Sequence, residues 1–271
     1  FAPAFREWLS RHKVPNRNPR QHQRNKMTSS EAPVGSSSSE IYESPQELAW
    51  AAALRFASLA EQFVAAQGKF TVALSGGSTP KAMLSLLAGK PFADSLPWKS
   101  IYFFWGDERC VPPDHADSNF RMAAEAVLSK VGVPQENVFR IPAEDEDHQR
   151  AAESYSATLH QFFNSEVPQF DLVFLGMGAD GHTASLFPGT AALQITDRIV
   201  TANFVEKLNA WTVGLAGGLL EGAPIRFAAE IAQHAQHMGH RGAQHAVGKG
   251  LAGGHAGQGL AAQVGGFLGA V

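Results

Sequence analysis

Residues 44–211 carry alternating stretches of helical and strand-like hydrophobic spacing. Ser44, Pro45 and Glu47 form a capping-box sequence, which starts a helix because serine accepts an unpaired N–H and proline suits the first helical position. The apolar residues that follow recur every three or four positions, as one face of an amphipathic helix requires. They are Leu48, Ala52, Phe56, Leu59 and Phe63. The spacing predicts a helix that ends at about residue 66.

Short apolar runs separated by further helical patterns predict a layered α/β fold. We expect strands over Phe70–Leu74, Ile101–Trp105, 170–175 and 198–204, and helices over 80–87, 119–130 and 149–163. The run Ile101–Trp105 is apolar throughout, as in a strand that is covered on both faces. Strands that alternate with helices predict a single Rossmann-like domain, with a mostly parallel sheet flanked by helices on both faces.

The N-terminal part of the chain differs from this body. Residues 1–26 contain seven Lys or Arg and one acid, and residues 27–43 are rich in serine. We expect 1–26 to be translated upstream sequence, Met27 to be the natural start, and 27–43 to be a linker to a domain over 44–211. A basic tail or a transit peptide is the alternative, which three prolines disfavour because they interrupt a continuous helix.

The C-terminal part also differs in composition. Residues 212–271 hold 15 of the 26 glycines and five of the eleven histidines, but only five charged residues. Glycine raises the entropic cost of ordering a helix or strand, so we expect this part of the fold to be aberrant, with a reading-frame change near codon 212. His234, His237 and His240 recur every three residues and could hold a metal on a helix, although the surrounding glycines disfavour one.

Composition narrows the classes of function. The formal net charge of −3 gives no electrostatic argument for nucleic-acid binding. No apolar run reaches the roughly 18 residues of a membrane span, and no secretory signal is evident. The single cysteine, Cys110, excludes an internal disulfide. We therefore expect a cytoplasmic protein without a nucleic-acid or membrane partner.

Three polar, glycine-containing loops follow predicted strands. In parallel sheets ligands bind beyond the carboxyl ends of the strands, so these loops are expected to converge on one rim. In the first loop, S-G-G-S-T-P, Gly76 and Gly77 allow close approach of an anion, and Ser78 or Thr79 can cap a helix with Pro80 at its first position. Such a helix start can bind phosphate. The alternative is a turn that only caps the helix.

The second loop, D-E-R-C-V-P-P-D-H-A-D-S-N, is dense in functional groups. Arg109 can form a fork to a phosphate or carboxylate. The alternative is a local ion-pair network of Asp107, Glu108 and Arg109, with one of residues 117–119 capping the next helix. Asp107, Glu108 and His115 match no standard metal site in their spacing.

The third loop, G-M-G-A-D-G-H-T-A-S, contains the candidate base. Gly181 separates Asp180 from His182, which lets the chain turn so that both side chains reach one site. A neutral histidine can activate water near pH 7, and a nearby carboxylate can orient it. The alternative is that His182 only hydrogen-bonds the backbone of a tight loop.

Together the three loops resemble those of 6-phosphogluconolactonases, which are similar in fold to glucosamine-6-phosphate deaminases. The resemblance covers roughly 44–211 and includes G-M-G-x-D-G-H-T-A-S-L-F-P-G and D-E-R-x-V-P-x-x-H-x-x-S-N. The deaminases typically continue G-H-I-A-F-N-E-P and carry D-E-Y. Here Thr183 follows the histidine and Arg109 follows the second acid, so the lactonase branch fits better.

The resemblance implies hydrolysis of 6-phospho-D-glucono-1,5-lactone to 6-phosphogluconate, in the oxidative pentose phosphate pathway. It implies that His182 deprotonates a water with the assistance of Asp180, and that neither a metal nor an organic cofactor is needed. The ligand is then a phosphorylated sugar lactone. The residues expected to bind it are Gly76, Gly77, Ser78, Thr79, Arg109, Asp107, His115 and Asn119.

The sequence departs from this family after Trp211. Family members continue with an arginine-led strand, a helix, and a strand ending in G-x-x-K-A, whose lysine usually helps to bind phosphate. Residues 212–271 do not match this pattern, and Lys249 lies among glycines. Two alternatives therefore stand beside the lactonase: an enzyme like the deaminases, and a catalytically impaired sugar-phosphate binder.

Overall fold

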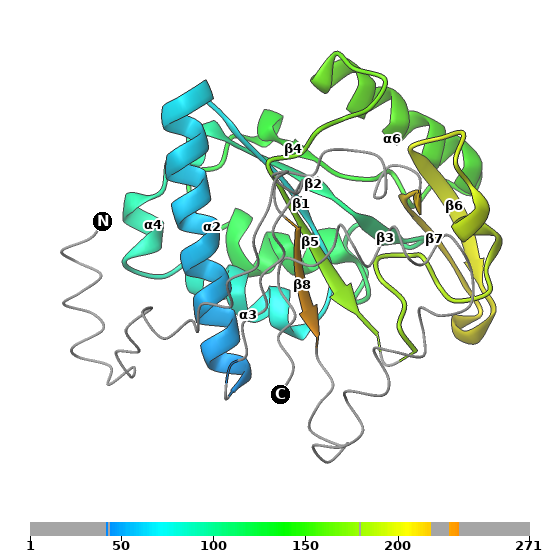
Figure 1. The fold of residues 1–271 in the computed structure, drawn as a ribbon, viewed down its shortest axis with the longest axis horizontal. Helices are drawn as coiled ribbons and strands as arrows, with labels where there is room; N and C mark the ends of the chain where they lie inside the picture. Colours follow the sequence, from blue (N-terminus) through cyan, green and yellow to red (C-terminus); the bar gives the residue numbers. More distant parts are fainter. Residues whose placement is uncertain (1–41, 43, 179, 218–227, 233–271) are drawn as a thin grey trace, which may run out of the picture.

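Helix α2 (Pro45–Gln67) begins at the predicted capping sequence. The Ser44 hydroxyl accepts the N–H of Glu47 at 3.2 Å, and the apolar face predicted for the helix is buried. The helix ends at Gly68, whose left-handed φ of 77° turns the chain toward the first strand. The computed structural model describes residues 42, 44–178, 180–217 and 228–232 (Figure 1).

The other described elements follow the predicted alternation, with ends that shift by up to two residues where a strand or helix was expected. The helices are α3 (Ser78–Leu87), α4 (Phe92–Ser95), α5 (Asn119–Ala123) and α6 (His148–Phe163), and α5 continues as a π-helical turn over Ala124–Leu128. The strands are β1 (Phe70–Leu74), β2 (Ile101–Trp105), β3 (Asp107–Arg109), β4 (Val138–Phe139), β5 (Leu172–Met177), β6 (Val200–Val205), β7 (Ala210–Leu215) and β8 (Ala228–Ala232).

Five of these strands form a central sheet in the order β4-β2-β1-β5-β8, and every neighbouring pair in it is parallel. The chain builds outward from β1 to β2 and β4, and then returns to the other side of β1 with β5. The strand order therefore reverses between β1 and β5. In open α/β sheets the crevice at this reversal, beyond the carboxyl ends of the strands, is where ligands bind.

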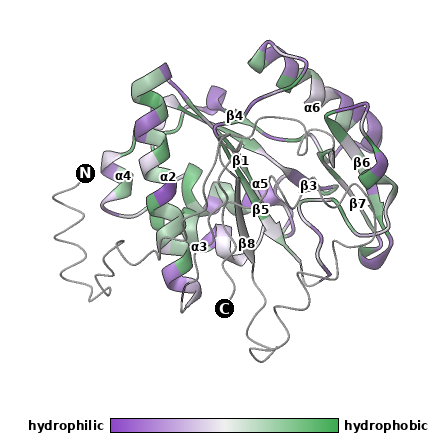
Figure 2. Ribbon diagram, in the orientation of Figure 1, coloured by the Kyte–Doolittle hydropathy of each residue, from purple (hydrophilic) through white to green (hydrophobic). Residues whose placement is uncertain are grey.

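Helices cover both faces of the central sheet, as predicted. Neighbouring residues of β2 point to opposite faces: Phe103 stacks against Phe56 of α2, whereas Phe104 packs edge-on against Phe162 of α6. Phe56 is fully buried, so its truncation to alanine should cost roughly 3–5 kcal/mol. Figure 2 shows hydrophobic residues along the central strands and mixed polarity on the covering helices.

A second sheet of three antiparallel strands, in the order β3-β7-β6, lies beside the first and was not predicted. Its strand β7 continues past Trp211, with Thr212, Val213 and Leu215 buried. Two parts of the region 212–271 thus belong to the sheets: the end of β7, and β8, which pairs with β5. The three regularly spaced histidines of that region lie outside the described residues, and its origin stays a prediction.

The side chain of Tyr155 hydrogen-bonds to the backbone at the end of β2. Tyr155 of α6 accepts the N–H of Trp105 and donates to the carbonyl oxygen of the same residue, both at 3.0 Å. Both bonds are buried, and β4 pairs only with Phe103 and Phe104. The tyrosine hydroxyl therefore satisfies the two backbone groups of β2 that lie beyond the reach of β4.

Within the described ranges, no helix combines the length and apolar character that crossing a membrane requires.

Candidate active site

Three loops meet at the rim where the strand order reverses. The first follows β1, the second surrounds β3, and the third follows β5. Backbone contacts hold the first two together, since the N–H of Gly106 donates to the carbonyl oxygen of Leu74 at 2.8 Å. A side-chain bond joins the second to the third: the Ser185 hydroxyl donates to Asp107 at 3.1 Å. The predicted convergence of the loops is confirmed.

The first loop leads into α3 earlier than the sequence predicts. The helix was expected to start at Pro80 with Ser78 or Thr79 as its cap, and this is wrong. It starts at Ser78, with Gly77 at the capping position at a φ of 114°, an angle that glycine adopts easily. Gly77 and Ser78 are exposed at this positive helix end, whereas Thr79 is buried.

Close packing fixes the position of the first loop. A Cβ on Gly76 would overlap the side-chain amide of Asn119, so only glycine permits this approach. Asn119 is 2% exposed and donates through Nδ2 to the carbonyl oxygen of Asp107 at 2.9 Å. Asn119, expected in the substrate-binding set, thus also braces the first loop against the second.

Glu108 organises the second loop through hydrogen bonds. Its carboxylate accepts the backbone N–H groups of Arg109, Asn119 and Phe120 at 2.7–2.8 Å, and the Ser118 hydroxyl at 3.1 Å. Burial raises the pKa of Glu108, and the four donors oppose that rise. Among the described residues no ion pair joins Arg109 to Asp107 or Glu108, so the alternative of a local ion-pair network is not what forms.

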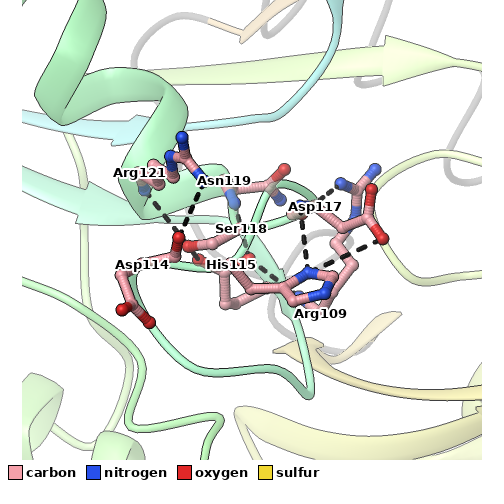
Figure 3. Close-up of polar contacts among 8 residues, drawn as sticks. Arg109, Asp114, His115, Asp117, Ser118, Asn119 and Arg121 are labelled. Atoms are coloured by element: carbon pink, nitrogen blue, oxygen red, sulfur yellow. Dashed lines mark hydrogen bonds and ion pairs between the residues drawn. The ribbon is translucent and has the colours of Figure 1, made fainter.

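The outer part of the second loop is cross-braced by side chains (Figure 3). Arg109 donates to the carbonyl oxygen of Asp117 at 2.7 Å, and Arg121 donates to that of Asp114 at 2.8 Å. His115 accepts the N–H of Asp117 at 3.2 Å. Of the three candidate caps of α5, Ser118 is the one used, since its hydroxyl accepts the N–H of Arg121 at 3.1 Å. Arg109 and His115, both expected to bind substrate, therefore both hydrogen-bond to the backbone of Asp117.

The third loop brings the predicted base and its partner together. His182 Nδ1 lies 2.5 Å from Asp180 Oδ1, and the turn between them uses a left-handed Gly181 with a φ of 83°. The imidazole stacks on Phe187, with ring centroids 4.0 Å apart. A Cβ on Gly178 would overlap the imidazole ring, so this glycine gives His182 the space to fold back over the loop. The alternative that His182 only hydrogen-bonds the backbone is therefore not what the structure shows, because its ring contacts the Asp180 and Phe187 side chains.

Lys207 completes the charged group around Asp180. It lies in the turn between β6 and β7, and its Nζ is 2.9 Å from Asp180 Oδ2. The hydrogen bond from Lys207, and after it that from His182, holds the pKa of Asp180 well below its usual range. Sequence reasoning missed Lys207, because the residue lies in a hairpin turn far along the chain.

Asp107 is buried and interacts with His182 through its charge. Burial raises the pKa of its carboxyl, while the charge of Arg109, the hydrogen bond from Ser185 and the charge of His182 lower it. The carbonyl oxygen of Ser185 in turn accepts Asn203 Nδ2 at 2.9 Å, which ties the third loop to the second sheet. Neither Ser185 nor Asn203 was predicted as a site residue. Ser185 belongs to the third loop, whereas Asn203 comes from β6 of the second sheet.

The structure gives no support for thiol chemistry or metal binding at the second loop. Cys110 is half-buried, and burial together with the charge of Glu108 raises the pKa of its thiol to about 12, so it is a poor nucleophile near neutral pH. In the part of the chain that the structure describes, no group of three or more His, Cys, Asp or Glu side chains could hold a metal ion.

Comparisons with known proteins agree with these loops. A family model described as "Glucosamine-6-phosphate isomerases/6-phosphogluconolactonase" matches residues 43–228. The 6-phosphogluconolactonase of Nostoc sp. is 52% identical over 138 residues, covering 50% of this chain and 56% of that protein. The chloroplastic 6-phosphogluconolactonase 3 of Arabidopsis thaliana is 42% identical over 159 residues, covering 55% and 48%. The chain thus spans about half the length of these curated relatives.

Solved structures agree in fold over a longer span. The 6-phosphogluconolactonase of Trypanosoma brucei is 27% identical, with a TM-score of 0.68, 86% of this chain covered and 95% of that one. The devB protein is 33% identical, with a TM-score of 0.65 and coverage of 71% and 79%. The family match spans more than half of the chain, and the chain therefore belongs to the glucosamine-6-phosphate isomerase/6-phosphogluconolactonase family.

Proposed function

We propose that this chain hydrolyses 6-phosphogluconolactone to 6-phosphogluconate. The observation that carries the proposal is the contact between Asp180 and His182 at the rim where the strand order reverses. Nδ1 faces the carboxylate and so carries the proton, and Nε2 has no protein partner among the described residues. A neutral imidazole held in this way can take a proton from water.

The steps follow from that arrangement. His182 Nε2 removes a proton from a water while its oxygen attacks the lactone carbonyl carbon, which forms a tetrahedral intermediate. Collapse of the intermediate breaks the bond to the ring oxygen, and the imidazolium returns the proton to that oxygen. Asp180 stays ionised and keeps the imidazole in one tautomer and orientation.

The phosphate belongs at the first loop. The start of α3 places the positive end of the helix dipole at Gly77 and Ser78, and such a helix start favours a bound anion. Gly76 and Thr79 flank this point, and Arg109 can add positive charge from the second loop. Residues 212–271 do not match the family's C-terminal lysine segment, so these groups are the phosphate contacts we propose. A place in the cytoplasm and in the oxidative pentose phosphate pathway belongs to the same proposal.

The decisive experiment compares lactone hydrolysis with its spontaneous rate. We expect the purified chain to accelerate the disappearance of 6-phosphogluconolactone, and His182→Ala to abolish the acceleration. His160→Ala is the control, because His160 lies at the far end of α6, where its ring contacts the carbonyl oxygen of Ser165. Equal rates for the wild type and His182→Ala would disprove the mechanism.

The family name also covers glucosamine-6-phosphate isomerases. Release of ammonia from glucosamine 6-phosphate would assign the chain to that activity instead. Binding of 6-phosphogluconate without turnover of either substrate would identify an impaired sugar-phosphate binder.

A further inference from the structure

Asp180 divides its two carboxylate oxygens between two partners. Oδ1 faces His182 Nδ1 at 2.5 Å, and Oδ2 faces Lys207 Nζ at 2.9 Å. Lys207 comes from the turn between β6 and β7, so the contact joins the second sheet to the third loop. The lysine side chain is 66% exposed, compared with 27% for Asp180 and 31% for His182. The cation therefore sits on the outer side of the pair.

The Lys207 ammonium group can counter an unfavourable effect that the Asp180 carboxylate has on a neighbouring base. A neighbouring negative charge favours the protonated imidazolium, which cannot accept a proton from water. An ammonium group on the other oxygen of the same carboxylate offsets that charge while leaving the hydrogen bond in place. It also keeps the carboxylate ionised, consistent with the strongly lowered pKa of Asp180, for which the bond from Lys207 is the largest cause.

We propose that Lys207 is a positioning residue, which holds Asp180 against His182 Nδ1 and offsets its charge so that the imidazole stays neutral and Nε2 is free to act. The role of Nε2 rests on the proposed function, whereas the effect of the lysine charge on the imidazole does not.

Other charged groups face His182, and the test must keep them constant. Asp107, from β3, interacts with His182 through its charge, and Arg109 interacts in the same way with Asp107. Phe187 packs on the imidazole face and carries no charge. A substitution of Lys207 leaves all three in place, so a difference from the wild type reports the lysine alone.

The experiment follows the His182 imidazole directly by NMR across a pH titration, with its resonance assigned from its loss in His182→Asn. For Lys207→Met we expect the titration midpoint to rise by about one pH unit, since one charge at this range changes proton affinity by about that amount. The acid limb of kcat/KM should move by the same amount. Lys207→Arg should restore both, and Lys99→Met, at an exposed lysine, should change neither.

Three results separate the possibilities. An unchanged midpoint in Lys207→Met with a wild-type circular dichroism spectrum would overturn the proposal, and so would a rise in KM alone, which would make Lys207 a substrate contact. A shifted midpoint in a protein that hydrolyses no lactone would support the role of Lys207 and reject the proposed function. If Lys207→Met does not fold, Lys207→Gln provides the same measurement with a polar, uncharged side chain.

Discussion

Gly178 offers a way to displace the proposed base without changing it. A methyl group added at this position would overlap ring atoms Cε1 and Nδ1 of His182, and would lie 2.9 Å from Asp180 Oδ1. Gly178 has no left-handed φ, so its backbone accepts alanine. The Gly178→Ala substitution should therefore act through the imidazole and its contact with Asp180, and not through backbone strain.

The expected magnitude follows from the overlap. Ordinary contact with a Cβ lies at 3.4–4 Å, so the ring must move by roughly 1 Å, and the hydrogen bond from Nδ1 to Asp180 lengthens or breaks. A misplacement of about 1 Å in a catalytic group costs roughly 100-fold in rate, or about 2.7 kcal/mol of transition-state stabilisation. Because His182 is partly exposed, we expect little change in melting temperature.

The assay is the initial rate of lactone hydrolysis above the spontaneous rate, with kcat and KM measured separately. We expect kcat to fall and KM to change little, since the substitution lies away from the proposed phosphate site. Gly176→Ala, two residues earlier at the end of β5, is the matched control, because no atom lies within 4 Å of its added Cβ. A folded Gly178→Ala protein with wild-type kcat would refute the reasoning, and equal losses in both variants would show that the loop rather than the ring is responsible.

Three further predictions concern the second loop. Glu108→Ala leaves four donors without an acceptor and should lower the free energy of unfolding by about 3 kcal/mol in urea titrations, whereas Glu125→Ala, at an exposed residue, should change it little. Cys110 should react slowly with a thiol reagent at pH 8 in the native protein and rapidly in denaturant, because burial raises its pKa to about 12; fast native labelling would contradict this. Asp107→Asn should raise the melting temperature at pH 7, because burial raises the pKa of Asp107 and the charged form therefore destabilises the fold. That gain should shrink as the pH falls through the raised pKa of the native carboxyl toward the ordinary value of 3.8. A lower melting temperature at pH 7 would show that the charge is stabilising.

Local patterns were sufficient to predict the main elements and the contact at the third loop. Helix α2 follows from a capping sequence and an apolar face, both of which lie within one segment of chain. Asp180 and His182 are two residues apart, so the turn at Gly181 alone can bring them together. The convergence of the loops followed from the general behaviour of parallel sheets rather than from any single residue.

Features that depend on distant pairing were not predicted. Strand β3 carries charged residues in all three positions and resembles a loop, and only its pairing with β7 buries Asp107 and Glu108. Lys207 reaches Asp180 because β6 and β7 form a hairpin whose turn lies beside the third loop. The composition of the region after Trp211 gave no sign that β7 continues through it to Leu215.

The Tyr155 hydroxyl has a consequence for the partly unfolded protein. The same helix that covers one face of the sheet also carries the group that closes the end of β2. If α6 detached on heating, an apolar face and an unpaired strand edge would be uncovered at once, a combination that templates aggregation between molecules. Docking of α6 therefore protects the solubility of the chain as well as its fold, and the first step of thermal aggregation should be the release of this helix.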